Sequence, residues 1–288
     1  MRAPLPQYRR EIVNTPDGDI IAADWIDGGE GQPLFILIHG MEGDSESRYA
    51  RILMNQSTAL GWTGVVLHMR SCGGLINRKP QFYHAGFYDD IQYFADEIIP
   101  ERYKENSIYM AGVSLGGSQL GHYLAKGKPS AHVKAAALIS APVDLRASAD
   151  YMQGGLNRLY IHKFVWPLLR KYRQKQEIIK NPGMLKSLSS ARSFWELDNA
   201  ATAPMHGFKD AADYYAKMSL KNVLKQIKLP TVYIAAKDDP FVPLASMPAA
   251  IADVPSMITD KGGHVGFVDR RGRSWMVPAV FKFFEAHP

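Results

Sequence analysis

This chain of 288 residues has few cysteines and no long hydrophobic runs, and each of these features excludes certain classes of protein. The single cysteine, Cys72, excludes an internal disulfide and is typical of a reducing compartment. No apolar run approaches the roughly 18 residues that span a bilayer, and residues 1–6 lack the apolar segment of a signal peptide. The sequence therefore predicts a cytoplasmic, globular protein without stable membrane insertion.

Motifs for metal and nucleotide chemistry are also missing. The chain has no H-E-x-x-H pattern and no Cys/His cluster, and no G-x-G-x-x-G follows an expected strand. The net charge is +6, but the positive residues are scattered except between Arg170 and Lys175. We interpret that run as a solvated helix face rather than a nucleic-acid contact. We therefore expect no metal, no cofactor and no nucleic-acid partner.

The stretch at 107–117, S-I-Y-M-A-G-V-S-L-G-G, carries the strongest functional signal. An apolar strand pattern ends in G-x-S-x-G with Ser114 at its centre, and a helical pattern follows. Such a turn lifts the serine hydroxyl above the end of the sheet and points a helix N-terminus at it. G-x-S-x-G alone arises by chance, and a Gly-rich loop without chemistry is the alternative. The flanking strand and helix favour Ser114 as a nucleophile.

Strand and helix patterns alternate along most of the chain, which predicts an α/β fold. We expect a mostly parallel central sheet with helices on both faces, in a single domain over residues 1–288. Strands are expected at 11–13 and 20–25, which form a hairpin, and at 33–38, 65–69, 108–113, 135–139, 231–236 and 256–259. Helices are expected at 45–60, 89–103, 119–124, 211–218 and 274–284.

The alternation is interrupted between residues 143 and 229, where no strand pattern occurs. Residues 158–179 are amphipathic and aromatic, and Pro167 is expected to kink this helix or to start its second half. We interpret 143–229 as a helical cap insert over the active edge of the sheet. We expect Phe164 and Trp166 to line the substrate pocket beneath it. A helical excursion that does not reach the site is the alternative.

A serine nucleophile needs a neutral imidazole to take its proton and a carboxylate to orient that imidazole. Asp238 and Asp239 follow the strand at 231–236, and His264 lies in a Gly-rich loop after the last strand. Both positions fall at the carboxyl edge of the sheet, where ligands bind. Successive residues leaving a strand point in different directions, so only one aspartate can orient His264. Because Pro240 restricts the residue before it to extended conformations, we predict Asp239 for this role. Asp238 should instead bind neighbouring backbone amides.

An oxyanion hole is the remaining part of such a site. Residues 39–43, H-G-M-E-G, follow the first buried strand and should face the same cleft as Ser114. We predict that the backbone N–H groups of Met41 and Leu115 bind the tetrahedral oxygen, which lowers the reaction barrier. A simple turn at the end of the strand is the alternative.

Together these motifs resemble the YheT-like branch of the α/β hydrolases, which includes ABHD-type esterases and lipases. The resemblance covers the chain from about residue 11 to its end. It implies Ser114, Asp239 and His264 as the catalytic set and carboxylic-ester hydrolysis as the activity, and D-x-x-V-P after Asp239 matches the family's loop spacing. Ser71 stands where the family usually has glycine. The motifs are H-G-M-E-G at 39–43, R-S-C-G-G at 70–74, Y-H at 83–84, G-V-S-L-G-G at 112–117, S-A-P at 140–142, Y-Y at 214–215, D-D-P-F at 238–241 and G-G-H-V-G-F at 262–267.

We therefore expect a serine hydrolase that cleaves short- to medium-chain acyl esters through an acyl-enzyme intermediate. Its partner would be a small-molecule acyl ester. Two alternatives remain open at this point. The fold could serve binding alone, since fold does not fix function. The protein could also be a lipase or thioesterase that docks on membranes through the F-V-W-P-L-L run at 164–169, beside basic residues.

Overall fold

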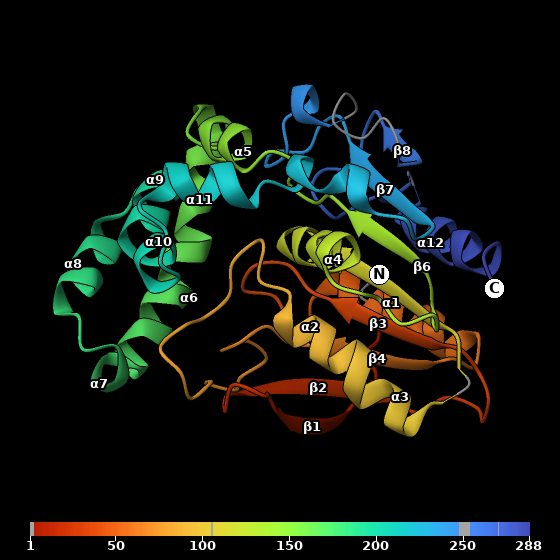
Figure 1. Cartoon of the computed structure of the whole chain (residues 1–288). Coiled ribbons are helices and arrows are strands. Elements are labelled where there is room, and N and C mark those ends of the chain that lie inside the picture. Colours follow the sequence, from red (N-terminus) through yellow and green to blue (C-terminus); the bar gives the residue numbers. More distant parts are fainter. Residues whose placement is uncertain (1–2, 105, 248–253, 270) are drawn as a thin grey trace.

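One sheet organises the molecule, with strands in the order β1-β2-β4-β3-β5-β6-β7-β8 (Figure 1). The computed structural model describes residues 3–104, 106–247, 254–269 and 271–288, so residues 1 and 2 of the N-terminal segment considered above lie outside it. β1 pairs with β2 and β2 with β4 in antiparallel fashion, and the other neighbours are parallel. The mostly parallel sheet is confirmed. The strands are β1 (Arg9–Asn14), β2 (Ile20–Ile26), β3 (Leu34–Ile38), β4 (Thr63–Leu67), β5 (Ile108–Val113), β6 (Val133–Ile139), β7 (Thr231–Ala236) and β8 (Ser256–Thr259).

Helices cover both faces of the sheet, which explains the continuous apolar runs in its central strands. Alternate side chains of β3 point to opposite faces. Ile36 belongs to the core cluster that contains Leu120 of α4. Phe35 belongs to the opposite cluster, with Leu53 of α1 and Phe281 of α12. The covering helices include α1 (Arg48–Ala59), α2 (Asp89–Tyr93), α4 (Leu115–Lys126) and α12 (Met276–Glu285).

The predicted helix at 89–103 has a widened middle. α2 continues through a π-helical turn, η1 (Phe94–Ile98), into α3 (Ile99–Arg102). Pro100 lacks an N–H group, and its ring would crowd the carbonyl four residues earlier in a regular α-helix. A local π-turn relieves that conflict.

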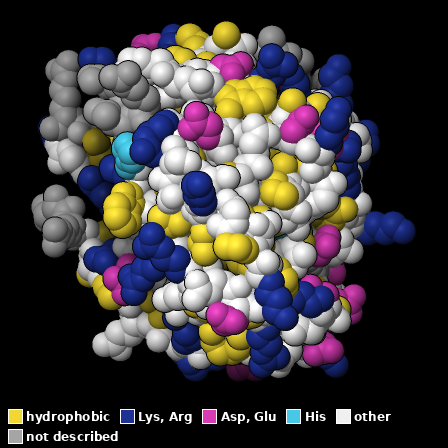
Figure 2. All heavy atoms as spheres, turned by 90° about the vertical axis from the view of Figure 1, so that its left-hand side faces the viewer, with side chains coloured by type: hydrophobic (Ala, Val, Ile, Leu, Met, Phe, Trp, Pro, Cys, Tyr) yellow, Lys and Arg dark blue, Asp and Glu magenta, His cyan; other side chains and the backbone are white. Residues whose placement is uncertain are grey.

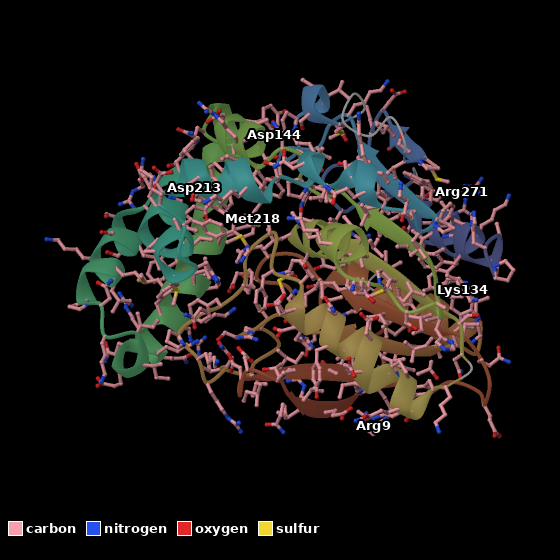
Figure 3. The ribbon with its side chains drawn as sticks, in the orientation of Figure 1. Arg9, Lys134, Asp144, Asp213, Met218 and Arg271 are labelled. Atoms are coloured by element: carbon pink, nitrogen blue, oxygen red, sulfur yellow. The ribbon has the colours of Figure 1, made fainter. Side chains whose placement is uncertain are left out.

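Between β6 and β7 the described chain is built from helices and turns, as the sequence pattern predicted. These helices lie together beyond one end of the sheet (Figure 1), and Met218, at the end of α11, lies on the side of them that faces the sheet (Figure 3). α6 runs through Pro167 without ending, and Pro167 lies near the middle of this helix. The helices are α5 (Leu145–Tyr151), η2 (Gly155–Tyr160), α6 (Ile161–Gln174), α7 (Gln176–Ile179), α8 (Pro182–Ser190), α9 (Phe194–Leu197), η3 (Asp198–Thr202), α10 (Ala203–Met205), α11 (Ala211–Met218), η4 (Leu220–Asn222) and η5 (Leu224–Gln226).

The basic run at the end of α6 is only half solvated, which corrects its interpretation as a solvated face. Lys175 is fully buried, and its Nζ donates hydrogen bonds to Asn77 Oδ1 at 2.8 Å and to the Pro80 carbonyl at 3.2 Å. Burial lowers the pKa of Lys175 to about 8. Lys171, one turn earlier on the same helix face, is also turned inward. On the surface formed by this end of the molecule, Lys and Arg side chains are interspersed with acidic and apolar ones (Figure 2).

None of the helices in the described part of the chain is both long and apolar enough to cross a membrane.

A buried guanidinium joins the N-terminal hairpin to the rest of the fold. Arg70, which is 4% exposed, donates to Asp17 at 2.9 Å, to Asp19 at 3.0 Å and to Asp90 at 2.7 Å. Asp19 lies in the β1–β2 turn and is fully buried, and Asp90 lies in α2. Arg70 therefore neutralises carboxylates from two separate elements.

Replacing Arg70 with methionine leaves two buried carboxylates without their cation. We expect Arg70→Met to lower the free energy of unfolding by about 3–5 kcal/mol. The control is Arg9→Met, because Arg9 on the outer strand β1 pairs with Asp27 where both side chains are exposed (Figure 3). That change should cost about 1 kcal/mol or less. Urea denaturation measures both, and equal losses would contradict the role given to Arg70.

Candidate active site

Ser114 occupies a strained turn between β5 and α4. Its φ of 55° and ψ of −121° lie in a region that side-chain-bearing residues rarely adopt. The turn is tight because the backbone around it is closely packed. A Cβ on Gly112 would overlap the Gly116 carbonyl, and a Cβ on Gly116 would overlap the His39 carbonyl. Glycine at both positions therefore permits the approach that exposes the Ser114 hydroxyl at the sheet edge.

The three residues predicted as the catalytic set form one hydrogen-bonded line. His264 Nε2 lies 2.8 Å from Ser114 Oγ, and His264 Nδ1 lies 2.9 Å from Asp239 Oδ2. Asp239 is 1% exposed, and its Oδ1 also accepts hydrogen bonds from the N–H groups of Phe241 at 2.8 Å and Val242 at 3.1 Å. These bonds fix the carboxylate, and the carboxylate in turn fixes the orientation of the imidazole.

The neighbouring aspartate has a different task. Asp238 Oδ1 accepts hydrogen bonds from the N–H groups of Gly262 and Gly263, both at 2.8 Å. It therefore ties the end of β7 to the loop that carries His264. The prediction that Asp238 binds backbone amides while Asp239 faces His264 is confirmed in its geometry.

The residues predicted to supply the oxyanion hole, Met41 and Leu115, both line the cavity that contains Ser114 and His264. Within the described residues neither backbone N–H donates a hydrogen bond to another protein group. Leu115 is the first residue of α4, so its N–H belongs to the free, positive end of that helix.

Two side chains hold the 39–43 loop in place. The hydroxyl of Tyr49 accepts from the Gly40 N–H at 2.8 Å. His39 donates from Nδ1 to its neighbouring carbonyl at Gly40, while its Nε2 accepts from the Met69 N–H at 3.1 Å. Full burial lowers the pKa of His39 to about 3, so the ring stays neutral and can accept that bond.

Glu42, next to Met41 in this loop, connects the loop to the insert. Its Oε1 accepts from the Tyr83 hydroxyl at 2.6 Å and from Lys171 Nζ of α6 at 2.7 Å. The backbone N–H of Glu42 also donates to the Tyr83 hydroxyl at 3.1 Å. The φ of Glu42 is 56°, and these contacts stabilise that conformation.

The cavity above Ser114 is lined from both sides. Leu145 of α5, Phe164 of α6 and Phe194 of α9 contribute apolar surface from the insert, and Phe241 contributes it from the loop after β7. Phe164 therefore shares a cavity with Ser114 and His264, and its role in binding substrate stays a prediction. The prediction for Trp166 is wrong: this side chain is 67% exposed and is not among the described lining residues. Residues two positions apart in an α-helix are separated by about 200° around its axis, so Phe164 and Trp166 cannot lie on the same face of α6.

Comparison with known proteins places this site in a family. A family model described as the alpha/beta hydrolase fold matches residues 33–270. YheT of Escherichia coli (strain K12), a candidate esterase, is 34% identical over 283 residues, which cover 92% of this chain and 82% of that protein. The chain belongs to the α/β-hydrolase family. Bovine phospholipase ABHD3 is 28% identical, with 98% of this chain and 72% of that protein covered. The structure of the Pyrococcus furiosus esterase Pf2001 matches with a TM-score of 0.65 at 15% identity, over 98% and 93% of the two chains.

The resemblance to the YheT-like branch of the α/β hydrolases is thus confirmed, and the fold agrees with it. Ser71, the departure from the family pattern, has a φ of 62°, which glycine adopts without strain. Its hydroxyl donates to the buried side chain of Asn77 at 2.5 Å. That bond compensates for the backbone conformation of this loop.

Several polar residues around the cavity were not predicted individually. Lys171 was hidden in a basic run, and Asp198 and Thr202 lie in a stretch without strand signals. Tyr83 and Tyr215 belong to motifs of the family resemblance, which was the available signal. The contact of Lys171 with Glu42 joins residues that are 129 positions apart, so no local pattern indicates it.

Within the described residues no group of three or more His, Cys, Asp or Glu side chains is arranged to hold a metal ion. Cys72 is buried, and desolvation raises the pKa of its thiol to about 12. It is therefore a protonated packing residue at neutral pH rather than a nucleophile.

The strain at Ser114 can be measured as stability. We expect Ser114→Gly to be more stable than Ser114→Ala by about 1–2 kcal/mol, because both remove the hydroxyl but only glycine relaxes the backbone. The control is Ser118, which is buried inside α4. There the order should reverse, with alanine favoured by about 0.5–1 kcal/mol. Thermal denaturation of the four variants gives both differences, and an alanine preference at Ser114 would show that the turn is unstrained.

Proposed function

We propose that this protein is a serine hydrolase that cleaves carboxylic esters through an acyl-enzyme intermediate on Ser114. The observation that carries the proposal is the hydrogen-bonded line from Ser114 through His264 to the buried Asp239. The N–H groups of Met41 and Leu115 at the same cavity have no acceptor among the described residues, and this supports the proposal. Relatives and structural neighbours that are named phospholipase and esterase support it as well.

The first half of the reaction transfers the acyl group to the protein. Ser114 Oγ attacks the ester carbonyl carbon while His264 Nε2 takes its proton. The negative charge moves to the carbonyl oxygen, where the N–H groups of Met41 and Leu115 would stabilise it. Asp239 stabilises the positive imidazolium. The tetrahedral intermediate then collapses, the C–O bond to the alcohol breaks, and His264 gives its proton to the leaving alcohol.

The second half releases the acid. A water molecule gives a proton to His264 Nε2 and attacks the acyl carbon, which again forms a tetrahedral intermediate in the oxyanion hole. The bond to Ser114 Oγ breaks, and the proton returns from His264 to that oxygen. The products are a carboxylic acid and the free enzyme.

Substrate size follows from the cavity. Its volume is about 110 Å³, whereas pockets for drug-sized ligands usually measure roughly 300–1,000 Å³. We therefore propose short- to medium-chain acyl esters as substrates. The insert at 143–229 would act as the cap of a single domain spanning 1–288, with Phe164 facing the acyl chain. The buried thiol of Cys72 supports a cytoplasmic location.

The two alternative functions fit the structure less well. A fold used only for binding has no need for an oriented Ser–His–Asp line at a strained turn. Membrane docking through residues 164–169 would need an exposed apolar patch. In that run Val165, Leu168 and Leu169 are buried, and Trp166 alone is strongly exposed.

The direct kinetic test uses p-nitrophenyl butyrate. We expect the wild-type protein to release a burst of about one p-nitrophenol per active site, because acylation by this activated ester releases p-nitrophenol faster than the acyl-enzyme is hydrolysed. Ser114→Ala should fold, show no burst and lose activity by about a thousandfold or more. Retention of more than about a tenth of the wild-type turnover by the folded variant would contradict the assignment of Ser114.

The adjacent aspartates provide a matched pair of variants. We expect Asp239→Asn to lower kcat by about four orders of magnitude, because an amide favours the wrong tautomer of His264. Asp238→Asn should lower kcat far less and act mainly on stability, since it weakens two bonds to the 262–263 backbone. Steady-state kinetics of the two folded variants decides the matter. A crippled Asp238→Asn beside an active Asp239→Asn would reverse the assignment.

A further inference from the structure

The cavity of the proposed active site is not uniformly apolar, because a buried carboxylate from the insert opens onto it. Asp198 begins η3 and is 7% exposed, and it lines the same cavity as Ser114 and His264. Thr202 and Tyr215, which also line the cavity, donate their hydroxyls to its two oxygens at 2.5 Å and 2.6 Å. A carboxylate has about four lone-pair sites, so each oxygen of Asp198 can accept another hydrogen bond.

We propose that Asp198 forms a polar subsite that binds a free hydroxyl of the substrate, so that the preferred substrates are esters of polyhydroxy alcohols. This inference rests on the proposed function, because it concerns substrate choice in the same cavity. Apolar surface beside Phe164 would take the acyl chain, and the subsite would take the alcohol portion.

The surroundings of Asp198 explain why a further hydrogen-bond donor is needed there. In the described part of the chain no Lys, Arg or His forms an ion pair with it, and its contacts are the hydroxyls of Thr202 and Tyr215. Desolvation raises its pKa to about 6, so most molecules carry the charge at neutral pH. A buried charge with only two donors is costly. A substrate hydroxyl would supply a third.

Neutral polar groups on the same cavity favour a hydroxyl over an ammonium group. Ser148 Oγ is buried and has no hydrogen-bond partner among the described residues. The Tyr214 hydroxyl accepts from the Ala85 N–H, which leaves its own hydrogen to donate. His84 Nδ1 accepts from the Gly86 N–H, so His84 carries its proton on Nε2. A hydroxyl can donate to Asp198 and accept from such groups, whereas an ammonium group can only donate.

The test compares two esters with the same acyl group, glycerol monobutyrate and propyl butyrate. We expect the wild-type protein to have the higher kcat/KM for the glycerol ester. In Asp198→Asn the ratio of the two kcat/KM values should fall about 10- to 100-fold, because a hydrogen bond to a charged group is lost. The matched control is Asp213→Asn on α11, whose carboxylate pairs with Lys217 outside the cavity and whose ratio should not change (Figure 3).

A second variant covers the case in which Asp198→Asn does not fold. This variant is Ser148→Ala, because Ser148 Oγ has no hydrogen-bond partner among the described residues and its loss breaks no such bond. Ser148→Ala should lower the same ratio roughly 2- to 10-fold. If folded Asp198→Asn slows both esters equally, Asp198 only supports the structure and the subsite is disproved. An unchanged ratio in Ser148→Ala, where Asp198→Asn does not fold, has the same consequence.

Butyrylcholine serves as a third substrate, and it tests whether the subsite binds a cationic group instead of a hydroxyl. A preference for it over the glycerol ester that is lost in Asp198→Asn would mean a cation site and overturn the hydroxyl proposal. The subsite and the proposed function fail differently. Ser114-dependent hydrolysis of propyl butyrate without the glycerol preference overturns the subsite alone. Absence of Ser114-dependent hydrolysis of all three esters overturns both.

Discussion

The hydrogen bond between His264 Nε2 and Ser114 Oγ joins two residues that are 150 positions apart in the chain, with 2.8 Å between the two atoms. A parallel sheet makes this possible, because the carboxyl ends of β3, β5, β7 and β8 lie at the same edge. Each of these strands is followed by one part of the proposed site. The 39–43 loop follows β3, Ser114 follows β5, the aspartates follow β7 and His264 follows β8. The apolar strands that fill both cores therefore also set the geometry of the site.

The insert acts on this edge in two ways. It lines one side of the cavity with apolar side chains such as Phe164, and it contacts the 39–43 loop through the ion pair of Lys171 with Glu42. Both side chains of that pair are largely buried, at 16% and 7% exposure, so it is protected from screening by salt. A shift of α6 would thus move the residue next to Met41.

The sheet and the hydrogen-bonded line of Ser114, His264 and Asp239 could be predicted from the sequence because both follow from local patterns. Apolar runs locate buried strands, and motif order places the three residues after the ends of strands. The D-x-x-V-P spacing of the resembling hydrolases, together with Pro240, favoured Asp239 over Asp238 as the partner of His264. The side-chain environment of the insert could not be predicted in the same way. Lys175 is buried because Asn77 and Pro80, almost a hundred positions away, provide its partners. No local pattern records such contacts, and for Phe164 and Trp166 the helix face had to be known.

Covalent labelling shows directly whether Ser114 is the nucleophile. The protein would be treated with a fluorophosphonate, digested and analysed by peptide mass spectrometry. We expect a single adduct on the peptide that contains Ser114, formed quickly in the wild-type protein and very slowly in His264→Ala, because the imidazole activates the hydroxyl. An adduct on another residue, or none on Ser114 in protein that is fully folded, would contradict the assignment of Ser114 as the nucleophile.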